Sequence, residues 1–344
     1  MILLMSTSGA TGSVLPAGYL AAEFLESTGT QYIKATALFD NNTKLEMLAR
    51  QTGVSSTSSF FGTEHMYTAN TNSNRFSCMV SGSAGQLRFD YGSKTDFSSF
   101  YIEQGVCYKI TKDAEKNYID GVLVFSNAPA VFDGLYGVLF ARGAGHSNGS
   151  NANGGLKCAI YWCNVFNSGK PEHAFVPALT DKGIPCMYDK VTKTQFRNSG
   201  GGRFIVGMTC KQALKLAELP AGGGELTVSL PSNWQDDEGV VTALATAEAN
   251  GWVLTYQTYD ADASTASTLA LRRIFVRKTQ NDNGQYVAAD GSRWHVEWCA
   301  GMIGAEPTDH GYEPFRSVDA AVAYWGLTPY VDPEAENLLT ELEQ

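Results

Sequence analysis

The segment CAIYWCNVFN, residues 158–167, constrains the fold most strongly, because it is apolar at both odd and even positions. A strand that is apolar on both faces lies in the middle of a sheet that is covered on both sides, as in a β-sandwich. Around it, residues 13–208 read as short alternating segments separated by polar turns, with no helical period of useful length. The sequence therefore predicts an all-β sandwich for this part of the chain.

The clearest hairpin signal is CYKITKDAEKNYIDGVLVFSN, residues 107–127. Its Asp120-Gly121 pair is flanked by apolar residues, and such a pair supplies the positive φ angles of a type I′ turn. We therefore expect a tight turn between Ile119 and Val122.

The segment EFLESTGTQYIKA, residues 23–35, combines hydroxyls, a carboxylate and a glycine. It lacks the G-K-[ST] ending of a phosphate loop and the G-x-S-x-G pattern of a nucleophile elbow. The remaining interpretation is strand, turn, strand. In it, Ser27 and Thr28 form local hydrogen bonds and Gly29 bends the chain.

Composition narrows the classes of protein further. The chain has 344 residues, 17% of them charged, and a formal net charge of −10 without a local Lys/Arg cluster. This balance gives no footprint for nucleic acid, and no stretch approaches the ~20 apolar residues of a membrane span. The apolar start, Ile2 to Met5, is too short for a secretion signal, so we expect synthesis in the cytoplasm without a signal peptide. Seven cysteines without a C-x-x-C pair predict reduced, mostly buried thiols.

The pattern changes after residue 208, where a short charged stretch meets Pro220 and three glycines. Acids precede an Ala-rich run that ends at Asn250-Gly251, which predicts one helix. We expect further helices at 317–326 and 332–344, strands at 252–259 and 268–278, and a hairpin at 286–298. The predicted parts are an N-terminal arm (1–14), a β-sandwich (15–208), a linker (209–224) and a small α+β domain with an acidic C-terminal helix (225–344).

Several blocks in order resemble the concanavalin-like, LamG-type jelly-roll domains that are common in gut bacterial surface proteins, tailed phages and prophages. These blocks are LPAGYLAAEFLESTGTQYIKA, LRFDYGS, KNYIDGVLVFSN, GVLFARGAG, CAIYWCNVFNSG and AFVPALTDKGIPCMYDKVTKTQFRNSGGGRF. The resemblance covers residues 15–207 and implies a jelly-roll sandwich. It leaves function open, because such sandwiches include lectins, hydrolases and packing modules.

The loop RGAGHSNGSNANGG, residues 142–155, is rich in amides, hydroxyls and glycine. Sugar hydroxyls need such donors and acceptors, usually beside an aromatic platform. The candidate ligand-binding residues are Arg142, His146, Asn148 and Asn151, with Tyr67 as a platform. Tyr91 fits either a platform or, by its parity, the core. The same loop also fits a plain sandwich edge.

The loop contains no Asp or Glu, which argues against a tight calcium site. We expect no cofactor, with calcium as an alternative that no specific motif supports. RWHVEWC places His295 and Glu297 on one strand face, where they could bind a metal with Asp309 or His310. The same pattern fits an exposed face opposite a tryptophan-lined core. LRRIFVRK, residues 271–278, fits a solvated strand face, a contact for an acidic tail or a contact for nucleic acid inside a capsid.

No run of alternating carboxylates on one strand is present in the sandwich, so no catalytic residues are expected. The sequence favours a non-enzymatic, phage-type structural protein that is associated with a particle. Its sandwich would recognise carbohydrate or a host surface, or decorate the particle, while residues 215–344 contact the particle or sister subunits in a homo-oligomer. The alternatives are a bacterial surface adhesin and a glycan-active hydrolase.

Overall fold

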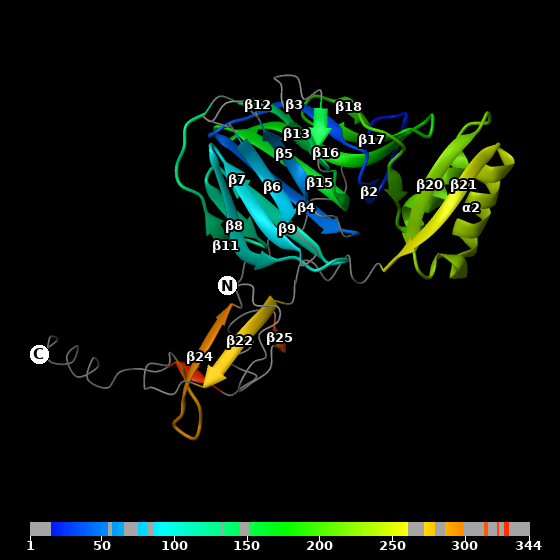
Figure 1. Ribbon diagram of the computed structural model, residues 1–344. Helices are drawn as coiled ribbons and strands as arrows, with labels where there is room; N and C mark the ends of the chain where they lie inside the picture. Colours follow the sequence, from blue (N-terminus) through cyan, green and yellow to red (C-terminus); the bar gives the residue numbers. More distant parts are fainter. Residues whose placement is uncertain are drawn as a thin grey trace, which may run out of the picture. The chain divides into compact units, whose positions relative to one another are not determined.

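The computed structural model divides the chain into two compact units, Met1–Thr268 and Leu269–Gln344. It describes residues 15–53, 57–64, 75–81, 85–132, 134–144, 151–153, 155–260, 272–278, 286–298, 313–315, 322 and 327–329. Figure 1 shows the elements of each unit.

The first unit contains a 13-stranded sheet whose main path runs β11-β10-β9-β4-β15-β2-β19-β20-β21, with β1, β16, β17 and β18 off this path. Its strands are β1 (Tyr19–Ala21), β2 (Phe24–Thr28), β4 (Thr43–Gln51), β9 (Cys107–Asp113), β10 (Lys116–Ile119), β11 (Val122–Ser126), β15 (Lys157–Asn167), β16 (Lys170–Thr180), β17 (Pro185–Asp189), β18 (Thr194–Arg197), β19 (Ile205–Gly207), β20 (Gly224–Pro231) and β21 (Trp252–Tyr259).

An eight-stranded sheet forms the second layer of this unit, in the order β14-β13-β5-β6-β7-β8, with β12 joining β5 to β3. Its strands are β3 (Ile33–Phe39), β5 (Thr57–Glu64), β6 (Arg75–Ser81), β7 (Gln86–Tyr91), β8 (Lys94–Tyr101), β12 (Leu135–Leu139), β13 (Arg142–Ala144) and β14 (Asn151–Asn153). The two sheets enclose an aromatic core, so the predicted all-β sandwich is confirmed (Figure 1).

The central strand is the one that the sequence singled out. β15 pairs with β4 along its length on one side and with β2 and then β16 on the other. Its Cys158 and Ile160 are fully buried, and so is Ala159 on the opposite parity. A strand covered on both faces needs apolar residues at both parities, and this is the pattern that predicted it.

The local turns also form as expected. Asp120 and Gly121 have φ angles of 51° and 83°, and Ile119 pairs with Val122, as a type I′ hairpin requires. In the segment 23–35, Ser27 Oγ donates a hydrogen bond to the Gln31 carbonyl at 3.1 Å, and Gly29 has a φ angle of 105°. That segment is therefore a local turn after β2.

A lysine lies in the core between the two sheets. Lys112 of β9 is fully buried, and its Nζ donates to Asn117 Oδ1 at 3.0 Å. The ammonium lies 5.0 Å from the Phe76 ring centroid and 5.1 Å from that of Tyr91. Ring faces and an amide oxygen replace water around this buried cation. Tyr91 is 2% exposed and belongs to the core, as its parity indicated.

The predicted linker at 209–224 differs from the structure. Thr209 caps a short helix α1 (Cys210–Ala213), which continues into the 3-10 helix η1 (Leu214–Glu218). β20 then pairs in parallel with β19, Val206 opposite Val228, so the large sheet continues across the expected boundary. The division between the units falls at 268/269 instead. The Pro and Gly signal therefore marks a turn within one unit.

Residues 224–259 form a β-α-β extension of the sheet. α2 (Glu238–Ala249) follows the 3-10 helix η2 (Trp234–Asp236), and β21 lies parallel to β20 across eight residue pairs. The Asp237 side chain accepts hydrogen bonds from the N–H groups of Gly239 and Val240, and Asn250 is the C-cap. The acids and the Asn-Gly pair thus begin and end the helix as predicted.

An aromatic cluster joins this extension to the sandwich. The Phe24 ring packs against those of Tyr161 and Tyr259 at 5.1 Å each, and the Tyr259 hydroxyl donates to Glu23. The guanidinium of Arg50 lies among the three rings, 5.1 Å from the Phe24 centroid. These side chains cover the outer face of β15, which explains why that strand is apolar on both faces.

The second unit is described in part. It has a five-stranded sheet of β25 (Glu313–Phe315), β22 (Arg272–Lys278), β24 (Arg293–Trp298), β23 (Tyr286–Val287) and β26 (Thr328–Pro329), in this order. The predicted hairpin is present, with Tyr286 opposite Trp294. The predicted helix at 332–344 lies outside the described residues, and so does that at 317–326 apart from Val322. None of the described helices is long and apolar enough to cross a membrane.

Candidate functional site

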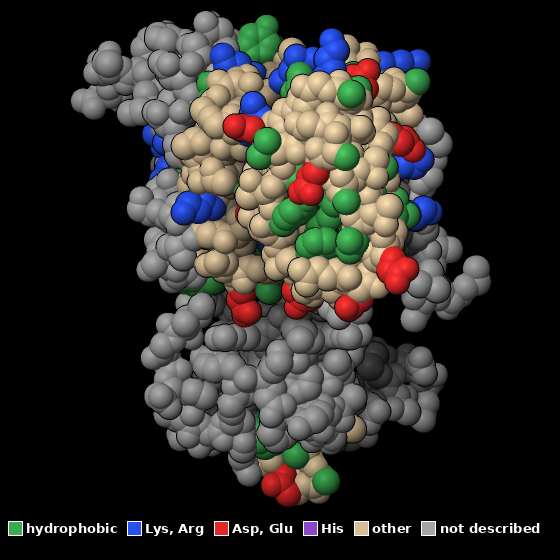
Figure 2. Space-filling model, turned by 90° about the vertical axis from the view of Figure 1, so that its right-hand side faces the viewer, with side chains coloured by type: hydrophobic (Ala, Val, Ile, Leu, Met, Phe, Trp, Pro, Cys, Tyr) green, Lys and Arg blue, Asp and Glu red, His purple; other side chains and the backbone are tan. Residues whose placement is uncertain are grey.

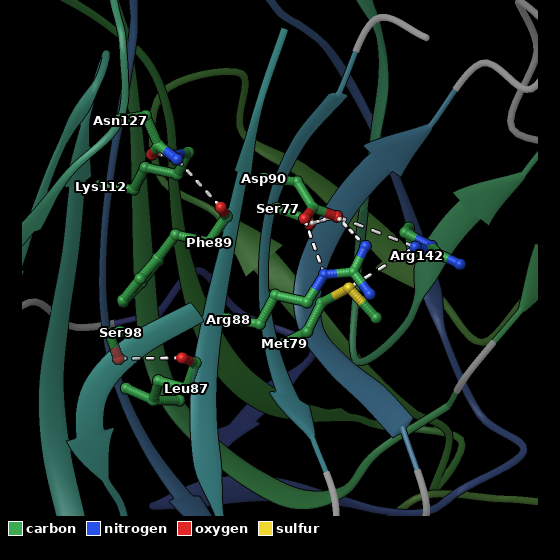
Figure 3. Close-up of polar contacts among 10 residues, drawn as sticks. All are labelled: Ser77, Met79, Leu87, Arg88, Phe89, Asp90, Ser98, Lys112, Asn127 and Arg142. Atoms are coloured by element: carbon green, nitrogen blue, oxygen red, sulfur yellow. Dashed lines mark hydrogen bonds and ion pairs between the residues drawn. The ribbon is translucent and has the colours of Figure 1, made fainter. Parts of the chain in front are cut away.

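The outer face of the eight-stranded sheet carries the candidate site, and Arg142 is part of it. Phe76, Phe89 and Tyr91 point inward to Lys112, so the alternate residues of β6 and β7 point away from the core. Ser77 and Asp90, a cross-strand pair, lie on that outer face. Figure 3 shows them on the opposite side of β7 from Phe89.

A glycine lets Arg142 reach this pair. β13 lies beside β5, with Gly143 paired to Thr63, and Gly62 of β5 lies directly opposite Ser77. A Cβ atom at Gly62 would lie 2.4 Å from the Ser77 Cβ atom, so no larger residue fits there without a backbone shift. The Arg142 side chain extends across β5 at this point and lies 3.5 Å from the Met79 sulfur (Figure 3).

The centre of the site is a buried carboxylate. Asp90 is fully buried, and its two oxygens accept hydrogen bonds from Arg88 Nε at 2.8 Å and Arg88 Nη2 at 3.2 Å. Ser77 Oγ donates to Asp90 Oδ2 at 3.0 Å, and Arg142 Nη1 lies 3.9 Å from the same oxygen (Figure 3). This bidentate pairing holds the Arg88 guanidinium in one plane and one orientation.

Charge and exposure give this cluster its chemical character. Arg88 forms an ion pair with Asp90, and Arg142 Nη1 lies 3.9 Å from the same carboxylate. Asp90 is inaccessible, whereas Arg88 and Arg142 keep 17% and 18% of their side chains exposed. Part of each guanidinium-bearing side chain is therefore accessible to a polar or anionic group.

The side chains of the other predicted ligand-binding residues lie outside the described part of the chain. Tyr67 lies in the segment between β5 and β6, and His146 and Asn148 lie in that between β13 and β14, all outside the described residues. The backbone of Asn151 is described in β14, where it pairs with Ala144, but its side chain is not. Of the predicted set, only Arg142 is placed together with its partners.

Sequence reasoning missed Arg88, Asp90 and Ser77 as site residues. In QLRFDYGSK, residues 86–94, Arg88 and Asp90 alternate with Leu87, Phe89 and Tyr91, which are buried in the core. The available signal was an arginine and an aspartate two residues apart on one strand face. Their pairing with Arg142, more than fifty residues away, had no counterpart in the sequence pattern.

A second polar cluster stabilises a turn. Burial alone would raise the pKa of Asp189, but hydrogen bonds from His173, the Ala174 N–H, Thr192 and the Val191 N–H outweigh it and hold that pKa below its usual range. His173 Nδ1 lies 2.7 Å from the carboxylate. The aspartate at the end of β17 thus anchors the turn that follows this strand.

Within the described residues, no group of three or more His, Cys, Asp or Glu side chains is arranged to hold a metal ion. His295 and Glu297 are described by their backbone in β24, and Asp309 and His310 lie outside the described residues. Of the six described cysteines, five are buried and none forms a disulfide.

Comparison with known proteins gave only distant structural likeness. No model of a known protein family matches the sequence. No curated protein matches it either. Among solved structures, a candidate carbohydrate-binding protein from Bacteroides ovatus matches 53% of this chain and 58% of its own, at 7% identity and a TM-score of 0.38.

Two further structures are similar in part. The CBM40 of the Ruminococcus gnavus IT-sialidase, bound to α2,3-sialyllactose, matches 42% of this chain and 89% of its own, at 13% identity and a TM-score of 0.31. A Trypanosoma rangeli sialidase matches 49% of this chain and 33% of its own, at 12% identity and a TM-score of 0.30. The chain thus spans less than two thirds of the Bacteroides protein and of the Trypanosoma enzyme.

Proposed function

We propose that the chain is a non-enzymatic glycan-recognition protein. The ligand-contacting surface in this proposal is the outer face of β6, β7 and β13, around Asp90, Arg88 and Arg142. The observation that carries it is the buried Asp90 carboxylate, which orients the Arg88 guanidinium by two hydrogen bonds while both arginines keep part of their surface exposed. A fixed donor array of this kind suits the oxygen atoms of a sugar.

The accessible guanidinium groups favour an acidic sugar. Arg88 and Arg142 each keep part of their side chains exposed. A carboxylate or sulfate on the glycan would accept hydrogen bonds in which both donor and acceptor are charged. With a neutral sugar only the donor is charged, and such hydrogen bonds are weaker.

The test is a glycan array probed with the full chain, with carboxylated, sulfated and neutral glycans side by side. Arg142→Ala is expected to weaken binding of the acidic glycans about tenfold or more, because a hydrogen bond to a charged group contributes about 1.5–3 kcal/mol. Arg197→Ala on β18 is the matched control, since Arg197 is an exposed arginine of the other sheet. If Arg142→Ala left glycan binding unchanged, or if the protein bound only neutral glycans, the proposed site would be wrong.

The biological setting is a separate part of the proposal. The resemblance of residues 15–207 to domains of tailed phages supports display on a phage-type particle, with decoration of that particle as the alternative role of the sandwich. The same resemblance supports a bacterial surface adhesin equally. Co-purification with particles would favour the first setting, and labelling of intact cells by an antibody would favour the second. Release of reducing sugar from a bound glycan would contradict a non-enzymatic role.

A further inference from the structure

β21 lies at the end of the 13-stranded sheet. It pairs with β20 in parallel across all eight residues, from Trp252 to Tyr259, without a register shift. Among the described strands, β20 is its only pairing partner. The other edge of β21 therefore presents backbone N–H and C=O groups that no described strand satisfies.

This edge lacks the features that usually protect one. Natural edge strands are short, bulged, or carry Lys or Pro, because a regular free edge is a template for another strand. β11 has a register shift against β10, β14 has three residues, and β18 has four and ends in an arginine. The sequence of β21, WVLTYQTY, has eight residues with no charge, no proline and no glycine. Unlike these other peripheral strands, it is at once long, regular and uncharged.

Apolar side chains are exposed on both faces of the same strand. Val253 is 62% exposed and Tyr256, at the opposite parity, is 37% exposed. Trp234 stacks on Tyr256 with its ring centroid at 5.5 Å, and Val241 of α2 is 44% exposed. Figure 2, which faces the side that carries α2, shows hydrophobic side chains at the surface among acidic ones. Exposed apolar groups along a free edge indicate a surface that another protein covers.

The described strands of this chain do not supply the partner. The two longest strands of the second unit, β22 and β24, are already paired on both sides, β22 by β24 and β25 and β24 by β22 and β23. The remaining strands of that unit have two or three residues. An eight-residue edge needs a strand of similar length.

We propose that β21 is a homodimer interface, in which it pairs with β21 of a second copy. Two identical strands related by a two-fold axis run antiparallel, and the contact is self-complementary. Because the strand carries no charge, self-pairing brings no like charges together, which a strand with Lys or Glu would do. The large sheet would then continue from one copy into the other. This inference does not depend on the glycan site.

The test is sedimentation velocity of the full chain from about 1 µM to about 100 µM, a range that detects dimers of ordinary affinity. The double variant Val253→Lys/Thr255→Lys adds four positive charges to the paired strands of a dimer and is expected to shift the protein to monomer. Val191→Lys is the matched control, because Val191 is also an exposed valine, at 42%, and lies in a turn of the sandwich. It is expected to stay dimeric.

Circular dichroism would first establish that each variant is folded. Hydrogen exchange gives a second readout, since amide protons of residues 252–259 should become better protected as the wild-type concentration rises. A wild-type monomer across the whole range would overturn the proposal. A dimer that persists in the double variant, or that leaves exchange in β21 unchanged, would place the interface elsewhere and overturn it too.

Discussion

Two arginine clusters on the outer faces of the two sheets have the same construction and different neighbours. Arg50 extends across β15 at Ala159 toward Phe24, and Arg142 extends across β5 at Gly62 toward Asp90. Arg50 is 5% exposed and contacts aromatic rings, and within the described residues its Nε atom is buried without a hydrogen-bond partner. Arg142 is 18% exposed and faces a carboxylate.

The difference teaches how to separate a structural arginine from a candidate ligand-binding one. Ring faces stabilise a guanidinium that stays buried, and there the side chain mainly fills space between the sandwich and the β-α-β extension. A buried carboxylate instead fixes guanidinium orientation while leaving charge at the surface. Four sets of variants test this distinction, in order of decreasing expected effect.

The largest effect is expected for Asp90→Ala. It leaves Arg88 and Arg142 without the buried carboxylate, and breaking a buried ion pair costs about 3–5 kcal/mol of unfolding free energy. Urea denaturation measures it. Asp113→Ala, at an exposed position at the end of β9, should change stability by less than about 0.5 kcal/mol. Equal stability of the two variants would show that Asp90 does not organise its cluster.

Tyr259→Ala comes next, on the aromatic side of the comparison. It removes the ring that packs on Phe24 at 5.1 Å, and truncation of a buried aromatic residue costs about 3 kcal/mol. Tyr259→Phe keeps the ring, loses the contacts of the hydroxyl with Glu23 and with the Met208 carbonyl, and should cost about 1 kcal/mol. Thermal unfolding of both, with Tyr136→Ala as an exposed control, measures the difference. A hydroxyl effect as large as the ring effect would contradict a packing role.

Replacing each arginine by methionine compares the two clusters directly. The free energy of unfolding of Arg50→Met should stay within about 1 kcal/mol of the wild-type value, because an apolar side chain of similar volume avoids the desolvation of a buried charge. Arg88→Met should lower the free energy of unfolding by about 2 kcal/mol more than Arg50→Met does, because it removes two hydrogen bonds from a buried carboxylate. If Arg50→Met proves the more damaging, cation–π contacts stabilise the fold more than ion pairing does.

The smallest effect concerns pH. Burial raises the pKa of Glu26, and hydrogen bonds from Thr52 and Gln257 and the charge of Arg50 offset only part of the rise. The unfolded chain therefore loses this proton at a lower pH than the folded chain does. Stability conferred by the protonated form is complete below the unfolded pKa, about 4.3, and declines as pH rises through the folded value.

Glu26→Gln should consequently be more stable than the wild type at pH 7 and indistinguishable from it below about pH 4. Urea denaturation at both pH values checks the sign. Glu46→Gln serves as the control, since Glu46 forms ion pairs with Lys44 and Lys109 at the surface. If the stability advantage of Glu26→Gln increased toward acidic pH instead, the pKa of Glu26 would be lowered by folding and not raised.

Much of the sandwich was predictable because its signals are local. The two-faced apolar strand, the Asp-Gly turn and the caps of α2 each depend on a few consecutive residues, and each formed as predicted. The sheet's continuation into β20 was not predictable, because parallel pairing of β19 with β20 depends on a contact across an intervening α1 and turn. Proline and consecutive glycines mark a chain reversal equally well within a domain and between domains.

The candidate site was predictable only in part for the same reason. Composition pointed to Arg142, and alternation put Arg88 and Asp90 on one strand face. Their assembly required the register of β13, β5, β6 and β7, and a glycine at position 62. Register between strands so far apart in the chain depends on tertiary packing, which a single sequence does not specify.

The packing of Tyr259 on Phe24 and Tyr161 has a practical consequence for anyone who wishes to express the sandwich alone. A polypeptide ended near residue 210 has the length of the resembling domain but loses Tyr259, β20 and β21. The Phe24 and Tyr161 rings and the outer face of β15 would then meet water, and such a surface promotes precipitation. A polypeptide that ends at residue 260 keeps that cover. Of the two truncated forms, we therefore expect this one to remain in solution.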